Sequence, residues 1–87
     1  MVYKIQIARV AQKQMLSLAR EAQIEIVRAI DSLANTPRPI GCKKLKGTEL
    51  WRFRLGRYRV VYQSIDKTRI ITIVKVVLRR EDTYRGL

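Results

Sequence analysis

The sequence predicts an α+β domain with the element order β-α-α-β-β-β, in which a four-stranded, mainly antiparallel sheet carries two N-terminal helices on one face. Three observations predict this class: an alternating strand pattern at the start of the chain, a long amphipathic helical pattern after it, and three strand patterns joined by short turns. The 87 residues suit a single domain spanning 1–87. Because the helices occupy one face, the opposite face of the sheet is available for function.

The first half of the chain is expected to hold one strand and two helices. Residues 2–8 alternate apolar and polar side chains, which is the pattern of a half-buried strand. Over residues 9–35 the apolar spacing lengthens to three- and four-residue steps, so we expect two helices with a break near residues 18–21. Pro37 and Pro39 forbid helical continuation, and a loop containing CKKLKG follows them.

The second half holds three strand candidates, at residues 50–55, 58–65 and 69–78. Their connections are only two and three residues long, so adjacent strands should pair as antiparallel hairpins. The last candidate contains IITIVKVVL, an almost continuous apolar run that is typical of a strand in the centre of a sheet.

The first hairpin contains the segment LWRFRLGRYRVVY, in which arginine alternates with apolar residues. If Gly56 supplies the positive φ of a type II′ turn with Arg57, then Arg54 pairs with Arg59, and Arg52 lies two residues away on the same strand. Paired residues share one face of a sheet. The geometry therefore predicts that Arg52, Arg54 and Arg59 gather opposite the core, while Arg57 stays at the turn.

The charge of the chain predicts a polyanionic partner. Lys and Arg number 19 against 7 Asp and Glu, which gives a net charge of +12. Residues 1–42 contribute six basic and three acidic residues, whereas 43–87 contribute thirteen and four, so the second half should meet the anion. Twelve of the cations are arginine, which favours bidentate phosphate contacts. From charge alone, an ordinary solvated face remains the alternative.

The composition excludes most kinds of active site. The chain has no histidine, and no pair of carboxylates is placed for acid–base work. Its one cysteine, Cys42, allows neither an internal disulfide nor a multi-cysteine metal site, so we expect no metal or cofactor and a reducing, cytoplasmic setting. Neither a signal peptide nor a membrane span is predicted. Attack of an RNA 2′-hydroxyl on its own 3′ phosphate fits the arginines and tyrosines, because the nucleophile is already tethered.

These features resemble the RelE family of bacterial toxins, within the wider RelE/ParE group of type II toxin–antitoxin systems. The resemblance runs along the whole chain: YKIQIA as the first strand, two helices, KKLKG before the second strand, LWRFRLGRYRVVYQ, IITIVKV, and a closing arginine and tyrosine. It implies a RelE-like fold and an endoribonuclease that enters the ribosome, cuts mRNA in the A site and inhibits translation. It also implies a cognate antitoxin, from which we expect an acidic or amphipathic binding segment.

By position, the resemblance implies a catalytic set on the arginine face and in the tail. Its members are Arg52, Arg54, Arg59, Arg79 and Tyr84. Arg80, one position further, is the alternative to Arg79. Because arginine stays protonated, Arg54 is expected to stabilise charge and not to act as a general base. Contacts to RNA or the ribosome are expected from a second group: Lys43, Lys44, Lys46, Arg57 and Arg80.

Two other functions stay open on the sequence. The ParE branch of the group shares the fold and inhibits DNA gyrase, but it commonly lacks the basic pair and the closing tyrosine that stand here at Arg52, Arg54 and Tyr84. A non-catalytic RNA- or DNA-binding module would use the same basic sheet without cutting. Trp51 is expected to pack in the core and not to stack on a base, since it alternates with the arginines.

Overall fold

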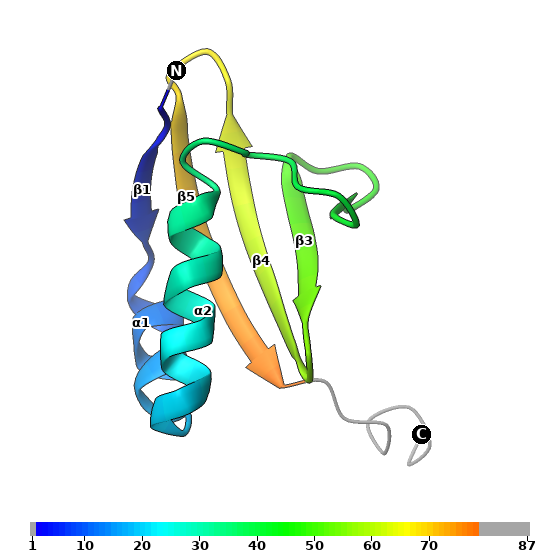
Figure 1. The fold of residues 1–87 in the computed structure, drawn as a ribbon. Helices are drawn as coiled ribbons and strands as arrows, with labels where there is room; N and C mark the ends of the chain where they lie inside the picture. The colour runs from blue at the N-terminus through cyan, green and yellow to red at the C-terminus, as the bar shows by residue number, and fades with distance from the viewer. Residues whose placement is uncertain (1, 79–87) are drawn as a thin grey trace.

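The sheet in this computed structural model has five strands in the order β1-β5-β4-β3-β2 (Figure 1). The structure describes residues 2–78. The elements in chain order are β1 (Lys4–Ile7), α1 (Arg9–Leu16), α2 (Arg20–Ser32), β2 (Lys43–Lys44), β3 (Leu50–Leu55), β4 (Tyr58–Ile65) and β5 (Ile70–Leu78). β1 and β5 are parallel, and the other neighbouring pairs are antiparallel. The predicted α+β class is confirmed with one correction: the loop before β3 contributes the short strand β2, so the sheet has five strands instead of four.

Both predicted helices form, and the break between them falls at residues 17–19. α2 crosses one face of the sheet, and α1 lies beside β5 (Figure 1). The break is held by Gln23, whose Nε2 donates to the Leu18 carbonyl at 2.8 Å. Beyond the end of β1, the Oε1 of Gln14 accepts from the Val76 amide at 2.7 Å. α1 therefore satisfies a backbone donor at the edge of β5 that β1 does not reach.

The core fills the space between α2 and the sheet. Its largest fully buried side chains come from α2 with its C-cap, from β4 and from β5: Ile26, Ile30, Leu33, Val60, Tyr62, Ile71, Ile73 and Val76. Removal of this apolar surface from water is the main stabilising contribution to such a fold. Trp51 is half-buried and packs against the same cluster, as its alternation with the arginines predicted. Within residues 2–78 neither helix has the length and apolar character needed to span a membrane.

The β3–β4 hairpin turns at Gly56 and Arg57, as predicted. Gly56 has a φ of +59°, and the positive φ falls on Gly56 and not on Arg57, as expected of a type II′ turn. The register pairs Arg54 with Arg59 and leaves Arg52 two residues away on the same side of β3. The predicted grouping of these three arginines on one face is therefore confirmed.

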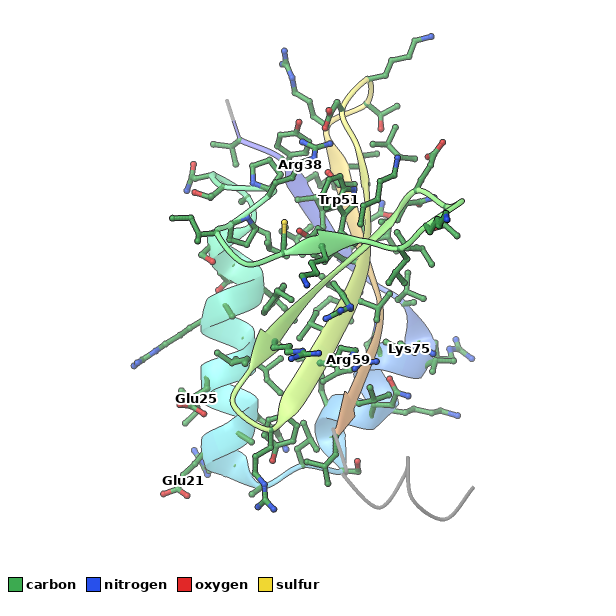
Figure 2. The ribbon with its side chains drawn as sticks, turned by 90° about the vertical axis from the view of Figure 1, so that its right-hand side faces the viewer. Glu21, Glu25, Arg38, Trp51, Arg59 and Lys75 are labelled. Atoms are coloured by element: carbon green, nitrogen blue, oxygen red, sulfur yellow. The ribbon has the colours of Figure 1, made fainter. Side chains whose placement is uncertain are left out.

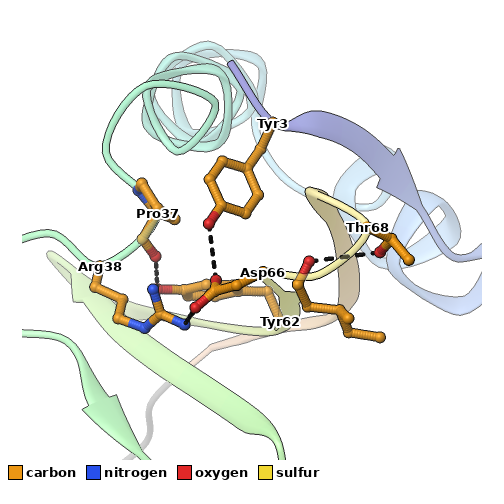
Figure 3. Close-up of polar contacts among 7 residues, drawn as sticks. Tyr3, Pro37, Arg38, Tyr62, Asp66 and Thr68 are labelled. Atoms are coloured by element: carbon orange, nitrogen blue, oxygen red, sulfur yellow. Dashed lines mark hydrogen bonds and ion pairs between the residues drawn. The ribbon is translucent and has the colours of Figure 1, made fainter. Parts of the chain in front are cut away.

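A polar cluster joins the loop after α2 to β1 and to the β4–β5 hairpin (Figure 3). The Arg38 guanidinium donates to both carboxylate oxygens of Asp66 at 2.9 Å, and the Tyr3 hydroxyl donates to the same carboxylate at 2.8 Å. Beside them, the buried Tyr62 donates its hydroxyl to the Pro37 carbonyl at 2.7 Å. These bonds hold the loop against one end of the sheet.

Candidate nucleic-acid interface

Two rows of residues in register cross the side of the sheet opposite α2. The first row runs from β2 to β5 and consists of Lys43, Arg52, Val61 and Lys75. The second row runs from β3 to β5 and consists of Arg54, Arg59 and Val77. Residues paired in this way project from one side of a sheet. We call this side the cationic face, defined by its five cations: Lys43, Arg52, Arg54, Arg59 and Lys75.

The acidic residues that the structure describes lie outside the two rows of the cationic face. Figure 2 shows Arg59 and Lys75 on the side of the sheet away from α2, while Glu21 and Glu25 point outward from α2 on the other side. The acidic residues of the described part of the chain all lie on α2, in the turn before β3 or in the β4–β5 hairpin. The rows of the cationic face therefore carry charge of one sign, which favours an anionic ligand.

The cationic face is apolar at its centre and charged around it. Val61, which is 2% exposed, lies between Arg52 and Lys75 in the first row. Arg52 and Arg59 are half-buried, whereas Arg54 and Lys75 are exposed. A half-buried arginine loses less side-chain freedom when a ligand binds, because part of that entropy was lost on folding. Arg52 and Arg59 are thus the better preorganised donors, and Arg54 and Lys75 can adjust to the ligand.

Guanidinium groups in this arrangement suit phosphate. Each presents planar N–H donors that match phosphate oxygens two at a time. Arg54 and Arg59 pair across neighbouring strands, which lie about 4.8 Å apart, so a single phosphate can accept from both. In the described residues, no three Cys, Asp or Glu side chains come together as a metal site would require. The chemistry that this face offers is therefore that of its own guanidinium and ammonium groups, which suit an anionic ligand.

The sequence matches a family model described as the ParE toxin of the type II toxin–antitoxin system parDE, over residues 5–83. The chain belongs to the RelE/ParE superfamily of type II toxins. A similar protein from Methanocaldococcus jannaschii, curated as a candidate toxin RelE1, is 30% identical to this RelE/ParE toxin over 90 residues, which cover 99% of each chain.

Solved toxin structures share the fold of this RelE/ParE toxin. A chain of the archaeal RelE–RelB complex from Pyrococcus horikoshii OT3 has a TM-score of 0.83 and 32% identity, over 93% of this chain and 99% of that chain. The isolated RelE toxin of E. coli has a TM-score of 0.79 and 23% identity, over 97% and 93%. The RelBE2 complex from Mycobacterium tuberculosis has a TM-score of 0.81 and 21% identity, over 91% and 100%. The predicted RelE-like fold is confirmed.

The other residues predicted to contact RNA lie in different parts of the toxin. Lys43 belongs to the cationic face through its pairing with Arg52, whereas its neighbour Lys44 projects from the helix side of the sheet. Lys46 and Arg57 are exposed in turns. The lysines expected in one loop therefore do not form one patch. Three further predicted residues lie outside the described part of the chain: Arg79, Arg80 and Tyr84.

Lys75 also belongs to the cationic face of the toxin, although the sequence pattern of β5 does not place it there. Ile71 and Ile73 are fully buried, so strict alternation along β5 would place residue 75 in the core as well. A bulge opposite Val61 and Tyr62 changes the side from which β5 projects its residues. The lysine itself could have indicated the bulge. A lysine that the alternation places in the core is almost never buried without a partner, so the strand would be expected to turn it outward.

Proposed function

We propose that this RelE/ParE toxin is a ribosome-dependent endoribonuclease that cuts mRNA in the ribosomal A site and so inhibits translation. The observation that supports the proposal is the pairing of Arg54 with Arg59, beside Arg52, on one side of the sheet. The hairpin fixes the relative positions of the two strands, so the backbone places both donors beside a bound phosphate. The family resemblance carried by LWRFRLGRYRVVYQ points to mRNA on the ribosome as the source of that phosphate.

The proposed reaction depends on charge stabilisation more than on acid–base groups. The RNA 2′-oxygen attacks the adjacent phosphorus and the bond from phosphorus to the 5′-oxygen breaks, which leaves a 2′,3′-cyclic phosphate and a 5′-hydroxyl. The 2′-hydroxyl loses a proton and the departing 5′-oxygen gains one. Arg54 and Arg59 would neutralise the charge that develops on the phosphorus-bound oxygens, while Arg52 orients the backbone. Because arginine stays protonated, we assign proton removal to water, the RNA or the ribosome.

The remaining predicted residues keep proposed roles. Tyr84 and Arg79, with Arg80 as the alternative to Arg79, complete the catalytic set through the family resemblance. Contacts to the ribosomal RNA backbone are proposed for four further exposed cations, which do not form one patch: Lys43, Lys44, Lys46 and Arg57.

A cognate antitoxin is the proposed regulator of the toxin. Similar chains come from structures described as a RelE–RelB complex and a toxin–antitoxin complex, RelBE2. The net charge of +12 favours an acidic or amphipathic segment in the partner. Addition of the cognate antitoxin should abolish cleavage, and the complex should separate from free toxin on gel filtration.

Primer extension tests the proposed activity. Purified toxin is incubated with ribosomes programmed with a defined mRNA, and in parallel with the same mRNA alone, and the new 5′ ends are mapped. Cuts at A-site codons in the ribosomal sample, with the free mRNA intact, support the proposal. Uncut mRNA in both samples, from toxin whose fold is verified by circular dichroism, contradicts it.

Inhibition of DNA gyrase is the second candidate function, and the family model favours it because that model describes a ParE toxin and matches residues 5–83. A supercoiling assay with the same protein separates the two candidates. Inhibited gyrase together with intact mRNA would assign the toxin to the ParE branch. Binding of RNA with neither cleavage nor gyrase inhibition would indicate a non-catalytic module.

A further inference from the structure

The pairing of β4 with β5 contains a β-bulge beside the arginines. Val61 pairs with Lys75 but the next residue, Tyr62, pairs with Ile73, so Val74 is an extra residue in β5. Bulges bend a strand and re-aim its side chains, and they are frequent next to active sites. In this strand the bulge separates a fully buried Ile73 from an exposed Lys75, two residues that strict alternation would place on the same side.

The bulge brings Lys75 into line with Arg52 and next to Arg59. Lys75 and Arg52 are the two partners of Val61, so they lie two strand spacings apart, about 9.5 Å. Arg59 pairs with Val77, which makes Lys75 its diagonal neighbour, at about 7 to 8 Å between positions. Figure 2 shows Arg59 and Lys75 projecting from the same side of the sheet. From these positions, side chains as long as those of lysine and arginine can contact the same bound polyanion.

The cations of the central strands form two rows and not one cluster. Arg54 and Arg59 belong to one row, and Arg52 and Lys75 belong to the other, two residues along the strands. Two residues of a strand span about 6.7 Å. That separation is on the scale of one nucleotide step in a single-stranded backbone, and each row supplies cations from two different strands. The arrangement suits two successive phosphates.

The aromatic residues favour backbone contacts over base contacts on this face. All the aromatic side chains in the described residues are in the core or pack against it: Tyr3, Trp51, Phe53, Tyr58 and Tyr62. Residues 2–78 therefore place no aromatic platform for base stacking on the cationic face. A lysine ammonium is a compact point charge that suits a phosphate oxygen.

We propose that Lys75, together with Arg52, binds the backbone phosphate next to the scissile phosphate, and that Arg54 and Arg59 hold the scissile phosphate itself. Lys75 is then a binding residue that sets the path of the RNA across β3, β4 and β5. The inference rests on the proposed function for RNA as the ligand. The competing ligand for Lys75 is an acidic segment of a protein.

Two short probes distinguish one phosphate site from two. A dinucleotide carries one phosphate and a trinucleotide carries two, and 2′-O-methyl groups on both remove the nucleophile and prevent cleavage. Their affinities for the full chain are measured by NMR titration over a series of salt concentrations. Wild-type toxin should bind the trinucleotide several-fold more tightly than the dinucleotide, with a steeper salt dependence by about 0.7 per added phosphate contact.

Lys75→Gln should reduce this trinucleotide advantage and its added salt dependence, because only Arg52 then remains at the second phosphate, and should leave dinucleotide affinity unchanged. Lys75→Arg should keep the advantage, because it keeps the charge. Lys13→Gln, an equal charge removal on α1, is the control and should match wild type. Thermal melting of each variant verifies the fold, which should tolerate these substitutions because both lysines are exposed.

An acidic peptide is titrated as a third probe. Three results for Lys75→Gln would overturn the proposal: wild-type affinity for both nucleotides, an equal loss of affinity for both nucleotides, or a loss of affinity for the acidic peptide alone. The last result would assign Lys75 to a protein interface. Since neither probe can be cleaved, these outcomes are independent of the ribosome assay. Failure to cut mRNA contradicts the proposed function without changing the number of phosphates that the face binds.

Discussion

Arg38 and Arg59 lie in regions that use arginine in different ways (Figure 2). Arg38 is held within the fold, because it donates to both oxygens of Asp66 at 2.9 Å and lies over the Trp51 ring, 5.0 Å from its centroid. The hydrogen bond from Tyr3 and then the bonds from Arg38 hold the pKa of the Asp66 carboxyl below its ordinary value. A carboxylate and an aromatic ring thus complement this cation.

The cationic face is built from like charges. Arg54 pairs directly with Arg59, an arrangement that destabilises a sheet, and Arg52 and Lys75 add charge of the same sign in the neighbouring row. An anionic ligand bound between the strands would offset this repulsion. The Arg38 region thus contributes to stability, whereas binding is the role that we propose for the cationic face. Substitutions in the two regions should therefore separate stability from activity.

The largest expected effect is the loss of cleavage in Arg54→Ala or Arg59→Ala. Removal of one donor to a developing charge costs a factor of about 10² to 10³ in rate. Single-turnover cleavage of mRNA on programmed ribosomes measures the rate, and thermal melting measures the stability.

Arg38→Ala is the matched control, since it removes the same charge from the other region. It should lower the melting temperature, because the Asp66 carboxylate and the Trp51 ring lose their partner, and it should cleave at close to the wild-type rate. Equal losses of cleavage in Arg38→Ala and Arg54→Ala would show that the two regions do not have separate roles.

The arginine pairing could be predicted from the sequence because local chemistry determines it. Gly56 can adopt a positive φ without strain, and a two-residue turn at that position leaves one register for Arg54 and Arg59. The helix break and the three strands of the second half follow similarly from short-range patterns. In each of these elements the determining residues lie within a few positions of one another.

The features that were not predicted depend on contacts between distant segments. Arg38 and Asp66 are 28 residues apart in sequence, and only the folded loop brings the guanidinium to the β4–β5 hairpin. The short strand at Lys43–Lys44 exists because it meets the edge of β3. The bulge that exposes Lys75 arises from how β5 pairs with β4, and a period of two along one strand does not contain that information.

A smaller effect, on stability alone, is expected from Tyr62→Phe in the Arg38 region. The Tyr62 ring is fully buried, and its hydroxyl donates to the Pro37 carbonyl at 2.7 Å. Loss of the donor leaves that carbonyl without this bond and should reduce the free energy of unfolding by about 1 to 2 kcal/mol. Urea unfolding measures this difference, and cleavage should stay at the wild-type rate. An unchanged unfolding free energy would mean that the bond does not hold the loop to the sheet.

The smallest expected effect depends on pH and concerns Asp66. Its pKa is lowered in the fold, so the ionised carboxylate is the form that stabilises the protein. That contribution is present above the ordinary pKa of aspartate, about 3.9, and is lost as the pH falls through the lower folded value. Asp66→Asn should therefore melt slightly below wild type at neutral pH, since exposed pairs contribute little, and the two proteins should converge once the pH is below the folded pKa. Melting curves across this range test the sign: a gap that persists in acid would show that Asp66 acts through its shape and hydrogen bonds instead of its charge.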